Sequence, residues 1–203
     1  IKKIDAVFVN TVESVYNCYR RNMFKLVMKS CPEIFPETEM RDMKDFPGIP
    51  PYFYNSHSVW IKRGDVHNTC LHDVHYIKRW EDAKRVKEDF EKRNIKDVMI
   101  QKHIEGDLVK FYGVGPGKWF CWFYHKPQVA RKYPFDEKKL KEKTTKFACA
   151  VGVEVFGGDA IVTKDLKIYI IDINSWPSFA RVRDEAKKHI AKHIFSKFQK
   201  EEG

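Results

Sequence analysis

Three side chains that could bind a divalent cation lie between residues 159 and 174. Asp172 and Asn174 follow the apolar run "IYII", and Asp159 lies in the segment "VFGGDAIV". Residues i and i+2 of a strand face the same side, and the short turn "KDL" indicates a hairpin that brings Asp159 near Asp172. Mg²⁺ prefers oxygen ligands, and two neighbouring carboxylates need a cation. The pattern predicts a magnesium site; the alternative is a set of solvated strand-end residues.

Two lysines are placed where they could neutralise an anionic ligand. Lys62 ends the run "SVWIK", so its ammonium could point into a cleft; the alternative is a surface lysine whose stem lies on apolar neighbours. Lys110 lies in the strand-like "LVKFYGVG", after the connector "IQKHIEGD". That connector could offer backbone groups to a purine, with Asp107 on a ribose and Lys110 on a phosphate. The alternative is that the connector and its two strands form an ordinary hairpin with no ligand.

Two other patterns match no known nucleotide or metal site. The spacing of "GVGPGK" differs from that of a phosphate-binding loop, and Trp119 stands where that loop needs a hydroxyl. A group of possible metal ligands lacks the spacing of a zinc site; it consists of His67, Cys70, His72 and His75. We therefore assign neither pattern a function.

Periodicity predicts a mixture of helices and antiparallel strands, which is an α+β fold. Helices are expected over 11–29, 80–93 and 136–150, with a C-terminal helix that carries Val182, Ala186, Ile190, Ile194 and Phe198 at steps of four. Strands are expected over 4–9, 58–62, 97–104, 108–115, 118–125, 153–163 and 167–174. The Pro-rich segment 31–57 is expected to be an irregular linker.

Composition predicts a globular, cytoplasmic protein that attracts anions. The 203 residues are 43% hydrophobic and carry a formal charge of +10. No apolar run approaches the roughly 18 residues of a membrane span, and no signal peptide is evident. The five cysteines form no C-x-x-C pair, which favours reduced thiols. No aromatic-basic RNA motif is present, so no specific nucleic acid is expected. Because the chain begins at Ile1, we expect a trimmed or incomplete N-terminus.

The order of these features resembles the ATP-grasp superfamily from about residue 58 to the C-terminus. The features that carry the resemblance are, in chain order, Lys62, a helix, the hinge segment 101–104, and the hairpin that ends in Asp-x-Asn-x-x-Pro at 172–177. The resemblance implies two α+β subdomains with the nucleotide between them, and an N-terminal domain that is largely missing. Residues 1–50 would be its tail and a linker, 51–105 the small subdomain, and 106–203 the large subdomain with the metal site.

The resemblance also implies roles for individual residues. Lys62 would bind the α- and β-phosphates of ATP, Lys110 would face phosphates, and Asp107 would hold the ribose. The residues expected around adenine, some of them through backbone groups, are Gln101, Lys102 and Ile104. Those expected to hold one or two Mg²⁺ ions are Asp159, Asp172 and Asn174. The implied catalytic cations are Lys62, Lys110 and Arg181.

Two features near these residues leave alternatives open. Arg181, with Arg183, lies just beyond Pro177 and could clamp an anionic acceptor, or both could be surface arginines. The segment "RGDVHNTCLHDV" departs from the family because it has one glycine where relatives have a glycine-rich lid. Either its histidines and Arg63 cover the phosphates instead, or part of the lid is absent from the chain as given.

Three functions follow from these observations. The first is an ATP- and Mg²⁺-dependent ligase that activates a carboxylate as an acyl phosphate for attack by an amine or thiol. The second is a kinase acting on a polyol or inositol phosphate, because Asp172 stands where many relatives have Glu and "GDLVKFYGVG" is similar to the inositol-phosphate kinase branch. The third is a non-enzymatic binder of anions or nucleic acid. The sequence indicates neither the acceptor nor an oligomeric state.

Overall fold

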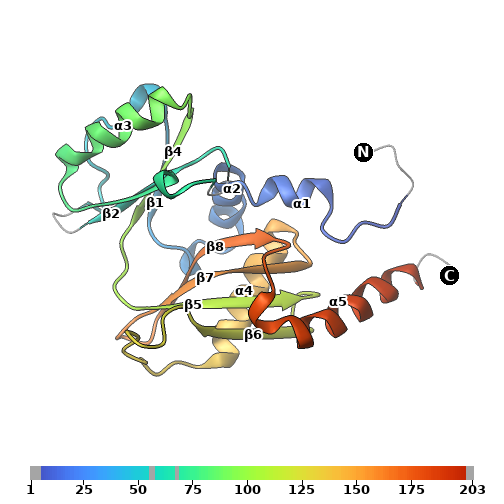
Figure 1. Cartoon of the computed structure of the whole chain (residues 1–203). Coiled ribbons are helices and arrows are strands. Elements are labelled where there is room, and N and C mark those ends of the chain that lie inside the picture. Colours follow the sequence, from blue (N-terminus) through green and yellow to red (C-terminus); the bar gives the residue numbers. More distant parts are fainter. Residues whose placement is uncertain (1–5, 55–57, 67–68, 200–203) are drawn as a thin grey trace. The chain divides into compact units, whose positions relative to one another are not determined.

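The computed structural model describes residues 6–54, 58–66 and 69–199. The chain divides into two compact units, Ile1–Asn17 with Glu105–Gly203, and Cys18–Ile104. We call them the large unit and the small unit. Each contains a four-stranded antiparallel sheet accompanied by helices, as Figure 1 shows, so the predicted α+β class is confirmed. The change from small to large unit at Ile104/Glu105 lies one residue from the predicted 105/106 boundary.

The sheet of the small unit has the order β1 (Thr38–Asp42), β4 (Asp97–Lys102), β2 (Val59–Arg63), β3 (Val74–Ile77). Helix α3 (Ala83–Lys92) packs against β2 and buries the apolar face that its spacing predicted, namely Ala83, Val86 and Phe90. Val59, Ile61, Val98 and Ile100 complete that core. The opposite sheet face therefore carries the alternate residues of β2 and β4, which include Lys62 and Gln101.

Strand β1 lies in the segment for which we expected an irregular linker. Its sequence, "TEMRD", has no apolar alternation, and its residues are half-buried or exposed. It forms because five consecutive residues pair with β4, from Thr38 opposite Gln101 to Asp42 opposite Asp97. Residues 18–50 thus lie in the small unit, which differs from the expected tail of a preceding domain.

The helix expected over 11–29 is two helices that lie in different units. Helix α1 (Val12–Asn17) belongs to the large unit, and α2 (Arg20–Ser30) to the small unit. Tyr19 between them is extended, with φ −64° and ψ 135°. Asn17 Nδ2 donates to the Val151 carbonyl at 3.0 Å, so side-chain contacts as well as backbone propensity end the first helix.

Residues 6–9 form no strand, which corrects part of the predicted strand over 4–9; residues 1–5 lie outside the described ranges. The next residue, Asn10, is held by its side chain instead. Asn10 Nδ2 donates to the Val155 carbonyl at 2.6 Å, and its Oδ1 accepts from Glu154 N at 2.6 Å. The N-terminal segment therefore attaches to the large unit without joining a sheet.

The sheet of the large unit has the order β6 (Trp119–Tyr124), β5 (Asp107–Val114), β7 (Val155–Val162), β8 (Ile168–Ser175). Helix α4 (Glu137–Val151) packs against β8 and buries the residues predicted to face inward, Leu140, Phe147, Ala148 and Val151. The Asp136 carboxylate caps this helix by accepting from Lys138 N at 2.8 Å. On the other face, Tyr112, Val114 and Trp119 form a core with Ala186 of α5 (Arg183–Phe198).

A β-bulge separates the apolar part of β8 from its polar end. Asp172 pairs with Asp159, but Ile170 pairs with the next residue, Ala160, so Ile171 is an extra residue. Because of this extra residue, Ile170 and Ile173 are both fully buried, while Asp172 and Asn174 share the opposite face. The bulge thus lets one strand anchor a core and present two oxygen-bearing side chains.

Within the described ranges, no helix is both long enough and apolar enough to cross a membrane.

Candidate functional site

Three charged side chains form a row across neighbouring strands of the large unit. Lys110 on β5 pairs in register with Asp159 on β7, which pairs with Asp172 on β8. The Lys110 ammonium donates to Asp159 Oδ1 at 2.7 Å. The predicted proximity of Asp159 and Asp172 is confirmed. Lys110 comes from a strand distant in sequence, so its contact with them depends on the pairing of β5 with β7.

The two carboxylates of this row differ in how their charge is satisfied. Burial raises the pKa of Asp159, the Lys110 ammonium acts in the opposite direction, and the neighbouring Asp172 adds to the rise. Asp172 Oδ1 is buried and accepts no hydrogen bond among the described residues. A buried carboxylate oxygen without a donor costs free energy. A hard cation at this position would remove both that cost and the repulsion between the carboxylates.

The third predicted metal ligand, Asn174, lies on the same face of β8, opposite Gly157. A Cβ atom on Gly157 would come within 2.7 Å of Pro177 Cγ, so only glycine lets the chain after Asn174 fold back onto β7. In the described part of the chain, no three His, Cys, Asp or Glu side chains gather as a metal site. The candidate set instead combines two carboxylates with one amide, and phosphate oxygens would complete the coordination.

Arg181 lies beside the row, against the aromatic residues of the same sheet face. Its guanidinium carbon is 4.9 Å from the ring centroid of Phe123, which pairs with Lys110 across β5 and β6. Tyr112 stacks on Phe123 at 5.8 Å. The stacking restricts the orientation of Arg181, as expected of a residue that presents its charge to an anion.

His125 is a further residue of this site that the sequence analysis did not identify. It follows β6 and lies two residues beyond Phe123, and its amide donates to the Leu108 carbonyl at 2.9 Å. Burial and the positive charge of Lys110 lower the pKa of His125 below its usual value, although Asp159 acts in the opposite direction. The imidazole therefore favours its neutral form. The sequence signal that could have identified His125 is the strand period of two, which places residue 125 on the same face as Phe123.

In the small unit, the structure brings two predicted residues into direct contact. Lys62 is 7% exposed, and its ammonium donates to Gln101 Oε1 at 2.7 Å. Gln101 Nε2 donates in turn to Thr38 Oγ1 at 3.1 Å. The side chain of Gln101 thus orients Lys62, and a place for Gln101 beside adenine stays a prediction.

The remaining residues expected around adenine follow in β4 and just beyond it. The Lys102 ammonium forms an ion pair with Glu37, and Lys102 N donates to the Glu37 carbonyl at 2.9 Å. Ile104 is half-buried and is the last residue of the small unit. An aromatic group lies on the sheet face of Lys62, where Trp60 and Tyr76 are 5.0 Å apart and Trp60 Nε1 donates to His103 Nδ1 at 3.0 Å.

Asp107 has a different role from the predicted one of holding a ribose. It is 4% exposed, and both of its carboxylate oxygens accept backbone hydrogen bonds. Arg131 N donates to Oδ1 at 2.7 Å and Tyr133 N donates to Oδ2 at 2.9 Å. These contacts fasten the segment before α4 to the start of β5. We therefore leave Asp107 out of the candidate nucleotide site.

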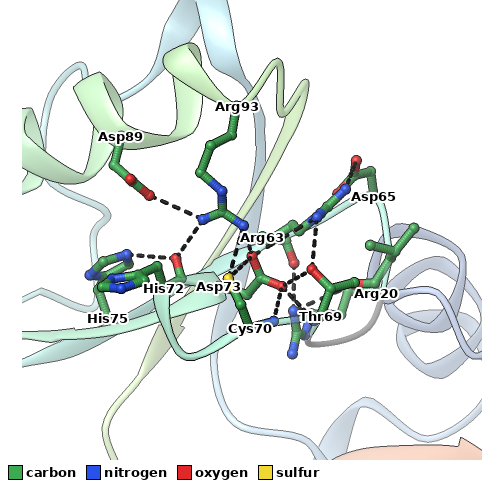
Figure 2. A network of polar contacts seen from close by, with 11 residues as sticks. Arg20, Arg63, Asp65, Thr69, Cys70, His72, Asp73, His75, Asp89 and Arg93 are labelled. Carbon is green, nitrogen blue, oxygen red and sulfur yellow. Dashed lines mark hydrogen bonds and ion pairs between the residues drawn. The ribbon is translucent and has the colours of Figure 1, made fainter.

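The connection between β2 and β3 is held by a network of charged and polar side chains, as Figure 2 shows. Asp73, whose side chain is 0% exposed, accepts from Thr69 N at 2.6 Å and from Thr69 Oγ1 at 2.8 Å, and it forms an ion pair with Arg93. Arg63 binds Asp65 through two hydrogen bonds of 2.6 and 3.0 Å. The guanidinium of Arg63 is therefore engaged within the small unit, which corrects its expected place over phosphates. His67 lies outside the described residues.

Comparison with solved structures shows which known proteins share this fold. The D-alanine–D-alanine ligase from Coxiella burnetii matches 95% of this chain with a TM-score of 0.68 at 12% identity, and the match covers 61% of that protein. The chain has the ATP-grasp ligase fold. The ATP complex of the Bacillus anthracis enzyme matches equally well, with a TM-score of 0.68, 15% identity, and coverage of 95% of this chain and 71% of that one.

Relatives of a second kind share this ATP-grasp fold. The ATP-grasp ligase PsnB with minimal precursor, Mg and ADP matches 90% of this chain and 58% of its own, with a TM-score of 0.63 at 12% identity. This chain thus spans about three-fifths of the length of several ligases that it resembles. Neither a protein-family model nor a curated protein sequence matches it.

Proposed function

We propose that this chain binds Mg-ATP and belongs to a cytoplasmic ligase that activates a carboxylate as an acyl phosphate. The observation that carries the proposal is the row Lys110–Asp159–Asp172, which ends in a buried Asp172 oxygen that accepts no hydrogen bond from the described residues. The ATP-grasp ligase fold supports the same function. In this proposal Asp159, Asp172 and Asn174 would hold Mg²⁺, which when bound neutralises phosphate oxygens of ATP.

The residues of each unit then have separate tasks. In the small unit, Lys62 is held by Gln101 and directs its ammonium at the phosphates. In the large unit, Lys110 supplies positive charge beside the carboxylates, and Arg181, stacked on Phe123, orients the carboxylate of an anionic acceptor. Phosphoryl transfer needs positioning and charge neutralisation more than a covalent protein group. A neutral His125 is suited to accept a proton from the attacking amine or thiol.

Mg-ATP is expected to raise the melting temperature of the chain. A ligand that binds only the folded state stabilises it by about 2.7 kcal/mol at 100 times its Kd, which corresponds to roughly 5–10 °C for a chain of this size. The measurement is thermal denaturation with Mg-ATP, with ATP in EDTA, and with Mg²⁺ alone. An unchanged melting temperature at saturating Mg-ATP would exclude nucleotide binding by this chain.

Replacing Lys62 by Met is expected to weaken Mg-ATP binding about tenfold or more. Met preserves most of the buried stem but removes a charge-assisted contact, which contributes about 1.5–3 kcal/mol. Titration calorimetry of the parent and of Lys62→Met measures the difference. Lys84→Met is the matched control, because Lys84 lies on α3 of the same unit and is exposed. Equal losses in both variants would argue against a specific role for Lys62.

The products distinguish a ligase from a kinase. A ligase converts ATP to ADP and free phosphate with a condensed product, and its acyl phosphate is trapped by hydroxylamine. A kinase leaves a stable phosphomonoester that hydroxylamine does not consume. Incubation of the protein with ATP and pools of carboxylates or polyol phosphates, followed by phosphorus NMR, separates these outcomes.

A further inference from the structure

A hollow lined by charged side chains lies at the turn between β5 and β6, within the large unit. Its volume is about 270 Å³. It is formed by that turn, by the residue before β7, and by the last two turns of α5, with Gly115, Lys118, Glu154, His193 and Lys197 among its walls. None of these residues belongs to the proposed nucleotide site, so this hollow is independent of the proposed function.

Glu154 is the one carboxylate of this cluster and is fully paired. Its Oε1 accepts from Lys197 Nζ at 2.6 Å, and its Oε2 lies 2.8 Å from His193 Nε2. Burial acts to raise the pKa of Glu154, but the hydrogen bonds from Lys197 and His193 outweigh it and lower that pKa. Glu154 is therefore ionised and already satisfied, so it does not oppose an additional anion as an unpaired carboxylate would.

Two groups at the hollow, the His193 ring and the Lys118 ammonium, could form further hydrogen bonds. His193 is 7% exposed, and its buried Nδ1 atom has no hydrogen-bond partner in the part of the chain that the structure describes. Among the described residues, the ammonium of Lys118 makes no hydrogen bond or ion pair. The two converge at Gly115, because a Cβ atom there would lie 3.1 Å from His193 Nδ1 and 2.9 Å from Lys118 Cδ. Lys118 is exposed, so its stem can move aside and open the imidazole edge to a ligand.

The hydrogen-bonding needs of His193 Nδ1 favour a phosphate group over other anions. When His193 Nε2–H donates to Glu154, Nδ1 is left as an acceptor and needs a donor. When the ring is protonated, Nδ1–H needs an acceptor instead. A phosphate group can meet either need, because its second pKa lies near neutrality, at about 6 in an ester. Sulfate can only accept at neutral pH. Two lysines and a histidine against one paired carboxylate leave a surplus of positive charge.

We propose that this hollow binds a phosphate group, either inorganic phosphate or that of a small phosphomonoester. The ammonium groups of Lys118 and Lys197 contact the phosphate oxygens, and His193 Nδ1 exchanges a hydrogen bond with it. Glu154 holds His193 and Lys197 in place.

The test is a titration of the whole chain at constant ionic strength with inorganic phosphate, glycerol phosphate and sulfate. Nitrogen-15 NMR of the Gly115 and Lys118 amides and of the His193 ring reports the site. We expect saturable shifts with phosphate or the monoester, and weaker binding of sulfate. The better ligand of the two identifies the source of the phosphate group.

The variants separate this site from the nucleotide site and from general charge effects. Lys118→Met should raise the Kd for phosphate about tenfold. His193→Gln retains a donor toward Glu154 but should abolish the preference for phosphate over sulfate. Lys192→Met, on the exposed side of α5, and Lys62→Met should leave the Kd unchanged. The proposal is overturned if millimolar phosphate shifts none of these nuclei. It is also overturned if Lys118→Met binds phosphate as the parent does.

Discussion

Asp172→Asn is expected to abolish the stabilisation by Mg-ATP while leaving the unliganded protein as stable as the parent or more stable. The substitution preserves the shape of the side chain but removes a negative charge beside Asp159. It also replaces a carboxylate oxygen by an amide NH2, which offers a donor to Asp159, whereas Asp172 Oδ1 of the parent accepts no hydrogen bond from the described residues. Loss of a metal ligand should reduce Mg-ATP affinity by at least about 100-fold, since even residues that only support a ligand contribute about 10–100-fold.

The first measurement is thermal denaturation without ligand. The second is calorimetry with ADP, once in the presence of Mg²⁺ and once in EDTA. In the variant, the affinity should no longer depend on Mg²⁺. Asp165→Asn is the matched control, because Asp165 lies in the turn of the same hairpin and pairs with Lys167 at 2.8 Å, away from the row. Retention of Mg²⁺-dependent binding by Asp172→Asn would remove Asp172 from the metal site.

Asp73→Asn is expected to destabilise the small unit by about 3–5 kcal/mol, which is the cost of removing the charge of one partner of a buried ion pair. The variant leaves Arg93 without its buried partner and weakens the hydrogen bonds from Thr69 (Figure 2). For a chain of this length, the melting temperature should fall by about 6–20 °C. Asp65→Asn, in the same connection but half-exposed, should cost much less, about 1 kcal/mol or below.

The pH dependence gives a second measure of Asp73. Burial acts to raise its pKa, but the hydrogen bonds from Thr69, Arg93 and Cys70 outweigh it and hold that pKa well below its usual range. The unfolded chain therefore binds a proton that the folded chain does not, and stability falls as the pH decreases below about 4. Asp73→Asn should lack this part of the acid sensitivity. If parent and variant lose stability in parallel between pH 5 and 3, Asp73 does not contribute as proposed.

The hairpin at the proposed metal site could be predicted because all of its determinants are local. The apolar residues of β8, the three-residue turn and the period of two place Asp172 and Asn174 on one face and bring Asp159 near them. The direct pairing of Asp159 with Asp172 depends on the β-bulge at Ile171, which the sequence did not indicate. Helices α3 and α4 could be predicted for the same reason, since apolar spacing within one segment decides which face is buried. Helix α5 was also expected, but its buried residues are Ala186 and His193, and Phe198 of the predicted apolar row is exposed.

Contacts between distant segments account for what the sequence missed. Strand β1 has no apolar pattern and exists because β4 offers an edge. The carboxylate of Asp107 is occupied by amides from residues 131 and 133, and Gln101 binds Lys62 across two paired strands. Each of these partners is at least 24 residues away from the residue that it contacts.

The sequence by itself thus determined the elements with a clear apolar pattern, the order of the candidate residues and the resemblance to ATP-grasp proteins. The tertiary structure decided which side chains remain available for a ligand. A hydrogen-bonding group is satisfied by whichever partner the fold brings within about 3 Å, and only the packing of whole sheets determines that partner. For this reason Asp107 became a structural anchor, whereas Asp172 kept an oxygen without a partner among the described residues.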